Sequence, residues 1–105
     1  MDKYFVTFRI YDGVAAGKSY DERRQSLIDA AYDGCEACWA ETTSFLMIST
    51  DLRTPDFLKK ITRGLSAAHD IVVVFDPDDQ SCSYFGPVAN ADLLRWFVPL
   101  AKKLP

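Results

Sequence analysis

The segment Tyr4–Tyr11 (YFVTFRIY) constrains the fold more than any other part of the chain, because large side chains fall on both of its faces. Its period of two predicts a β-strand. One face carries Val6, Phe8 and Ile10, and the opposite face carries Phe5, Thr7, Arg9 and Tyr11. We therefore expect a sheet that needs cover on both sides.

The next elements follow from local signals. The sequence Ser19-Tyr-Asp-Glu22 matches a capping box and predicts a helix from Tyr20 to Asp33, which Gly34 ends. Two strands are predicted over residues 36–42 and 44–50. Thr54-Pro55-Asp56 is typical of a helix start, and the apolar run before Asp76 predicts a further strand over residues 70–76.

This order predicts an α+β fold, the ferredoxin-like βαββαβ sandwich, with an antiparallel sheet in the order 4-1-3-2 and two helices on one face. The core covers about residues 4–76. A short strand and a final helix occupy about residues 83–104, where Asn90 opens the helix and Pro99 kinks or ends it. We expect one side of that helix to carry Leu93, Phe97, Leu100 and Leu104. The 105 residues form one domain, 1–105.

The second face of the sheet is expected to be too apolar to stay in water. It carries Phe5, Tyr11, Phe45 and Met47. Either the C-terminal helix or a second subunit must cover it, and we favour a homodimer because twofold dimers are the commonest assembly.

Charge and cysteine content narrow the function classes. Twelve basic and fifteen acidic residues give a net charge of −3, which counts against tight, general binding of nucleic acid. Three cysteines without a secretory signal favour a reduced, cytoplasmic protein. No apolar run approaches the roughly 20 residues that span a bilayer, so we expect no membrane partner.

Two stretches resemble a known family. The strand ending Ile10-Tyr11-Asp12 is similar to the first strand of the small CRISPR adaptation proteins of the Cas-two type. The segment Trp39–Asp51 (WAETTSFLMISTD) more closely resembles their standalone, SinR-like bacterial relatives. The resemblance covers about residues 4–86 and rests on short motifs.

The resemblance implies a homodimer in which a strand near Ser83–Phe85 pairs onto the partner's sheet, which adds Tyr84 and Phe85 to the interface. It also implies a role for Asp12, as a catalytic residue of an Mg²⁺-dependent nuclease or as a dispensable residue beside a nucleic-acid scaffolding role. The acidic net charge and the Gly-Ala loop after Asp12 depart from the family.

Topology supplies candidate metal ligands. The expected sheet places Asp12, His69 and Asp70 at one end, where two carboxylates, those of Asp12 and Asp70, suit Mg²⁺. Solvated strand ends are the alternative interpretation.

Phosphate contacts are a second candidate chemistry. The loop Gly13–Ser19 (GVAAGKS) resembles a phosphate loop with one residue missing, so Lys18, Ser19 and the helix amides are candidate phosphate ligands. Arg23, Lys59, Lys60 and Arg63 form a candidate basic strip, which a solvated helix face also explains.

The sequence is compatible with two functions. One is a Cas-two-like, SinR-like homodimer that binds nucleic acid weakly, with Mg²⁺-dependent nuclease activity through Asp12. The alternative is a non-catalytic protein–protein interaction module, such as an antitoxin or a regulatory subunit. The pair Cys35-x-x-Cys38 lacks the further ligands of a zinc site and follows a helix end, so we interpret both as small apolar residues.

Overall fold

A computed structural model describes all 105 residues. It is a mixed α+β structure in which three helices pack on a six-stranded sheet. The strands are β1 (Asp2–Arg9), β2 (Ala37–Trp39), β3 (Phe45–Thr50), β4 (Ile71–Phe75), β5 (Cys82–Phe85) and β6 (Ala101–Lys103). The helices are α1 (Tyr20–Tyr32), α2 (Thr54–Ile61) and α3 (Ala91–Phe97). No helix is both long and apolar enough to cross a bilayer.

The sheet has the order β2-β3-β1-β4-β5-β6. It differs from the expected order 4-1-3-2 because β5 and β6 extend it beyond β4, although the first four strands keep the expected antiparallel neighbours. The resemblance placed the strand near Ser83–Phe85 on a partner's sheet, but here β5 pairs with β4 of its own chain. The last strand, β6, was not expected at all and pairs parallel to β5.

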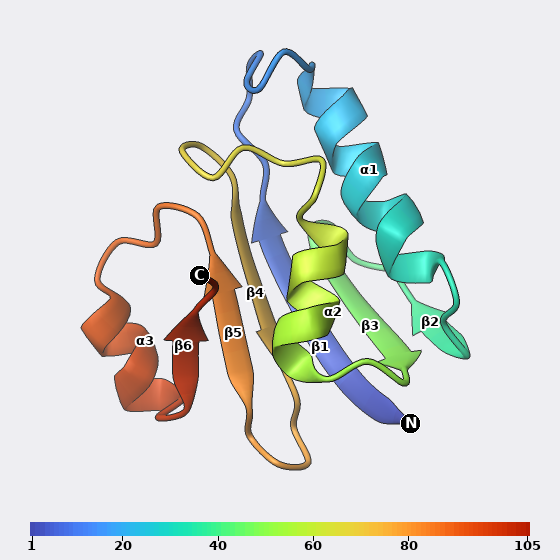
Figure 1. Cartoon of the computed structure of the whole chain (residues 1–105), viewed down its shortest axis with the longest axis vertical. Coiled ribbons are helices and arrows are strands. Elements are labelled where there is room, and N and C mark those ends of the chain that lie inside the picture. The colour runs from blue at the N-terminus through green and yellow to red at the C-terminus, as the bar shows by residue number, and fades with distance from the viewer.

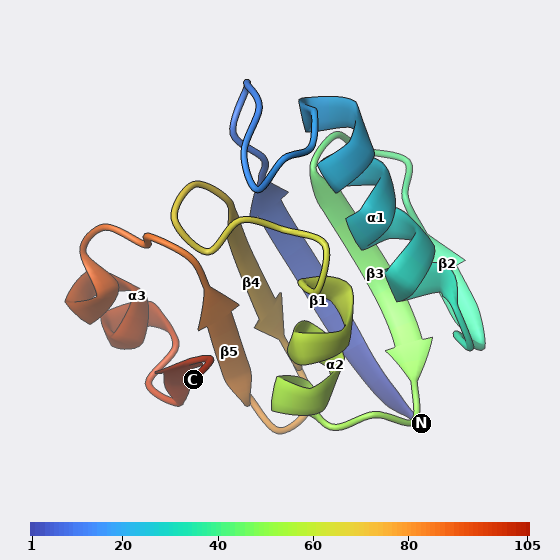
Figure 2. The same ribbon diagram turned by 45° about the horizontal axis from the view of Figure 1, so that its top comes forward.

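The main core lies between the sheet and helices α1 and α2, which lie side by side over one face in both views (Figures 1 and 2). The alternation predicted for the first strand is confirmed, since Val6, Phe8 and Ile10 are buried on this side. Leu46 and Ile48 of β3 join them. Apolar side chains of both helices complete the cluster, chiefly Leu27, Phe57, Leu58 and Ile61.

Local signals set the helix ends. Ser19 and Glu22 form the predicted capping box and begin α1, because each side chain accepts a hydrogen bond from the other's backbone amide. The predicted helix start at Thr54-Pro55-Asp56 is found in α2, where Thr54 is the first residue and its hydroxyl contacts Ser81 and Tyr4. The last helix ends at Phe97, two residues before Pro99.

A smaller apolar cluster covers only one half of the opposite sheet face. Helix α3 lies beside β5 and β6, away from α1 and α2 (Figure 1). Its inward side chains, Ala91 and Leu94, and the following Val98 pack against Cys82 and Tyr84. We expected Leu93, Phe97 and Leu100 to share one side of this helix with Leu104. The structure leaves the first three exposed, whereas Leu104 contacts the main core.

Candidate functional site

One row of paired residues crosses the whole sheet and defines the candidate site. Strand pairing aligns Trp39 with Met47, Met47 with Phe5, and Phe5 with Phe75. The row continues through Cys82 to Ala101. Trp39, Met47 and Phe5 are 42%, 38% and 36% exposed, whereas Cys82 and Ala101 at the other end are 2% and 3% exposed beneath α3. The same face is therefore covered at one end and bare at the other.

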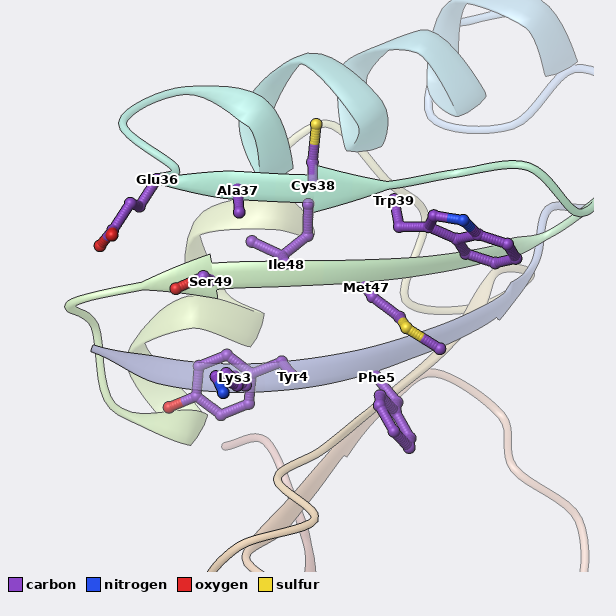
Figure 3. A pocket seen from close by; sticks show the side chains of 10 residues that line it. All are labelled: Lys3, Tyr4, Phe5, Glu36, Ala37, Cys38, Trp39, Met47, Ile48 and Ser49. Atoms are coloured by element: carbon purple, nitrogen blue, oxygen red, sulfur yellow. The ribbon is translucent and has the colours of Figure 1, made fainter.

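We call the bare part the open half, and it consists of Phe5, Trp39, Phe45 and Met47 on β1, β2 and β3. The ring centroid of Phe45 lies 5.9 Å from that of Phe5 and 6.4 Å from that of Trp39. A shallow groove of about 360 Å³ runs along it, lined mainly by apolar side chains, with Lys3, Glu36 and Ser49 as its polar residues. Figure 3 shows Trp39, Met47 and Phe5 following one another across the three strands. The groove holds no set of converging polar groups, so its chemistry suits apolar contact.

The predicted interface residues divide into three groups. Phe5, Phe45 and Met47 lie in the open half, as the alternation of their strands suggested. Tyr11 lies beyond the end of β1, 44% exposed, with its ring 4.8 Å from that of His69. Tyr84 is buried, its hydroxyl accepting a hydrogen bond from Arg95, and Phe85 packs against the main core. In the folded chain, Tyr84 is therefore covered and Phe85 is only partly exposed, so the open half does not include either of them.

Trp39 is the member of the open half that the interface prediction lacked. It lies in a three-residue strand with too little sequence for an alternating pattern. Only its pairing with Met47 on the neighbouring strand places Trp39 in the open half, and the sequence does not show this pairing.

Asp70 and Arg23 form a buried ion pair at the end of the sheet where β1 finishes and β4 starts. Both side chains are fully buried, and Arg23 Nε donates to Asp70 Oδ2 over 2.9 Å. The same guanidinium donates to the backbone oxygens of Tyr11, Gly13 and Lys18. Arg23 was a candidate phosphate ligand, and the structure corrects this because its donors are already occupied inside the protein.

The carboxylate of Asp70 is equally occupied. It accepts hydrogen bonds from the amides of Tyr11 (2.9 Å) and Ser66 (2.8 Å) as well as from Arg23. Burial alone would raise the pKa of Asp70, but the hydrogen bonds from Ser66, Arg23 and Tyr11 outweigh it and lower that pKa below its ordinary value. A carboxylate with this set of partners is not free to hold a cation.

The structure does not bring the expected metal pair together as two free carboxylates. Asp12 is exposed in the loop after β1, and no group of three or more His, Cys, Asp or Glu side chains gathers to hold a metal ion. His69 Nδ1 lies 3.1 Å from the hydroxyl of Ser66 and so belongs to the turn before β4. Of the two expected Mg²⁺ ligands, Asp70 is already paired with Arg23, and Asp12 is exposed.

We expect millimolar Mg²⁺ to leave the melting temperature of the protein unchanged, because a ligand stabilises only a folded state that binds it. Thermal melts with Mg²⁺ and with an equal ionic strength of Na⁺ provide the measurement. A rise specific to Mg²⁺ that disappears in the Asp12→Asn variant would contradict this.

The glycine loop does not form a phosphate cradle. Ala15 and Lys18 exchange two backbone hydrogen bonds of 3.0 Å, which close a tight turn over Ala16 and Gly17, both at positive φ. Ser19 is occupied by its capping box with Glu22, so its hydroxyl serves α1. Lys18 keeps an exposed side chain on this loop.

The basic residues of α2 lie on the helix-covered side of the molecule. Lys59, Lys60 and Arg63 line a shallow cavity of about 480 Å³ with Asp56 and Leu52. Lys60 Nζ lies 3.4 Å from a carboxylate oxygen of Asp33 at the end of α1, so part of this charge is neutralised. These cations face away from the open half and do not form a common surface with it.

The cysteines are free thiols. Burial, followed by the nearby Cys38, raises the pKa of Cys35, and burial raises the pKa of Cys82 to about 11. Raised thiol pKa values disfavour the reactive thiolate at Cys35 and Cys82.

No family model, no curated protein and no solved structure matches this chain.

Proposed function

We propose that this chain is a non-catalytic protein–protein interaction module that binds an amphipathic helix of a partner on its open half. The observation that carries the proposal is the cross-sheet row, in which Trp39, Met47 and Phe5 are bare while Cys82 and Ala101 lie beneath a helix. Large apolar side chains grouped on a surface mark interaction sites. An antitoxin or a regulatory subunit works in this way.

The dimensions of the open half suit a helix. Three strands spaced about 4.8 Å apart span roughly 10 Å, which is the diameter of a helix with its side chains. On the other half of this face, a helix of the chain itself already covers the sheet, since α3 packs on Cys82 and Tyr84. A helix with apolar residues three and four apart can place them between Trp39, Met47 and Phe5, as in other helix-in-groove complexes.

The nuclease expected from the resemblance has less support. Its catalytic candidate Asp12 belongs to no group of three or more potential metal ligands, and its second ligand Asp70 is bound to Arg23. The remaining support for a nucleic-acid partner is the exposed part of the basic strip, Lys59 and Arg63. The free thiols support a reducing compartment, so we retain a cytoplasmic location as part of the proposal.

Selection from a displayed library of amphipathic helical peptides tests this function. We expect peptides selected on the wild-type protein to bind the Met47→Asp variant at least about 30-fold more weakly, because a carboxylate in the centre of an apolar contact stays unpaired. Val14, which is exposed in the loop before α1, offers a matched Val14→Asp control that should bind normally. Failure to enrich any peptide that distinguishes Met47→Asp from the control overturns the proposal.

A further inference from the structure

The outward surface of α3 is the second bare apolar surface of the molecule. It consists of Leu93, Trp96 and Phe97, which are between 51% and 75% exposed. We call these three residues the outer face of α3. The rings of Trp96 and Phe97 pack edge to face with centroids 4.9 Å apart, so they form one protruding aromatic unit. The helix thus has an inward side that covers its own sheet and an outward side that nothing in the chain covers.

We propose that the outer face of α3 in one copy of this chain occupies the open half of a second copy, and that the second copy does the same in return. The inference rests on the proposed function, because it identifies the partner helix as α3 of another protomer. Two different surfaces then meet twice around a twofold axis, which gives a closed homodimer.

Both surfaces belong to the same side of the sheet. Neighbouring strand residues alternate between faces, and Cys82 and Tyr84 pair with Phe75 and Val73, which face away from the main core. Helix α3 packs on that side, and the open half continues it along the row from Phe75 to Phe5. Each protomer therefore presents a helix and a bare sheet surface side by side, which is the arrangement a reciprocal exchange needs.

The chain's own α3 is held where it is and cannot cover its own open half. Arg95 donates a 3.2 Å hydrogen bond to the hydroxyl of Tyr84, which fixes the helix to β5. Immediately after the helix, β6 pairs with β5 from Ala101 to Lys103. The outer face of α3 can be covered only by another molecule.

The exposed apolar area is close to what a stable dimer needs. A large apolar side chain has roughly 150–250 Å² of surface when fully exposed, and the seven residues of the two surfaces are partly exposed, so together they offer roughly 650 Å² per copy. A standard stable interface buries about 800 Å² on each partner. Charge does not oppose the contact, because Asp92 on α3 is paired with Arg95 over 2.7 Å and the net charge of the chain is only −3.

Sedimentation equilibrium of the full chain over a wide concentration range tests the dimer. We expect a wild-type monomer–dimer equilibrium, and a dissociation constant at least about 30-fold higher for Met47→Glu in the open half and for Trp96→Glu on α3. The Val14→Glu control, at a residue 74% exposed in the loop before α1, should dimerise like wild type. Circular dichroism and melting temperature report whether each variant is folded, and Trp39→Ser replaces Met47→Glu if that protein unfolds.

A mixing experiment tests the reciprocal geometry itself. Met47→Glu keeps an intact α3 and Trp96→Glu keeps an intact open half, so an equimolar mixture can rebuild one of the two contacts. We expect the mixture to contain heterodimers at concentrations where each variant alone is monomeric. A dimer formed by two open halves, or by two copies of α3, would show no such rescue and would overturn the inference.

The outcomes separate the inference from the function on which it rests. A wild-type chain that stays monomeric throughout the concentration range overturns the inference. In that case selected peptides that still depend on Met47 preserve the proposed function with a different partner helix.

Discussion

The Asp70→Ala variant is expected to lose about 3–5 kcal/mol of its free energy of unfolding, because the change leaves the guanidinium of Arg23 buried without a counter-charge. Arg23 and Asp70 are both fully buried, so bulk water does not screen their interaction. A domain of this size is stable by only about 5–15 kcal/mol, so the loss removes a large part of the total. Urea unfolding at neutral pH measures it.

A surface ion pair supplies the matched control. Asp92 and Arg95 lie 2.7 Å apart on α3, but the side chain of Asp92 is almost fully exposed. Removing such an exposed pair by Asp92→Ala should cost at most about 1 kcal/mol. If Asp70→Ala and Asp92→Ala cost the same, the buried pair does not hold the structure together as the contacts indicate.

The same pair predicts the sign of a pH effect. The folded-state pKa of Asp70 is lowered, so its contribution is fully present above the unfolded pKa of about 3.9 and is lost as the pH falls through the folded pKa. The difference in stability between wild type and Asp70→Asn should therefore shrink when the pH is lowered below about 4. Acid titrations of both proteins, followed by circular dichroism, measure this difference.

The burial of Arg23 could not be predicted from its residue type, because arginine is usually found at the surface. Arg23, Leu27 and Ala31 are four residues apart on α1, and all three are completely buried. This spacing puts Arg23 on the apolar stripe of α1, whereas its charge alone led us to predict it as part of a candidate basic strip that binds phosphate. Its partner Asp70 is 47 residues away, so only the folded chain shows why an arginine can occupy that stripe.

The central strands were predictable because each carries a complete local pattern. Alternation in the first strand assigned Val6, Phe8 and Ile10 to the main core, and the capping box placed the start of α1 at Tyr20. The open half followed in part from the same alternation, through Phe5, Phe45 and Met47.

The C-terminal region was harder because its elements are short. The three residues of β6 include two lysines, and no period can be recognised in such a segment. For α3, the apolar residues lie around most of the helix, so the sequence did not distinguish the inward Ala91 and Leu94 from the outward Leu93 and Phe97. That ambiguity reflects a real property, since both sides of this helix are apolar.

The backbone of Asp70, whose side chain pairs with Arg23, also contacts the segment that follows β5 and leads to α3. The chain leaves β5 at Gly86, whose backbone passes directly beside the backbone of Asp70. A Cβ atom built on Gly86 would lie 1.8 Å from the carbonyl oxygen of Asp70 and 2.9 Å from its carbonyl carbon. The position therefore requires glycine for space as well as for its φ of +94°.

Replacing Gly86 by alanine is expected to cost about 2–5 kcal/mol, through left-handed backbone strain of about 1–3 kcal/mol together with the displacement of the backbone at Asp70. Gly17 is the matched control, since its φ is +73° but nothing lies within 4 Å of a Cβ built there. Gly17→Ala should show the strain alone, about 1–2 kcal/mol. The difference between the two variants in the free energy of unfolding, measured by urea unfolding, then gives the cost of the contact with Asp70.

Equal losses for Gly86→Ala and Gly17→Ala would show that the loop after β5 can move away from β4 at little cost. The position of α3 would then not depend on this contact.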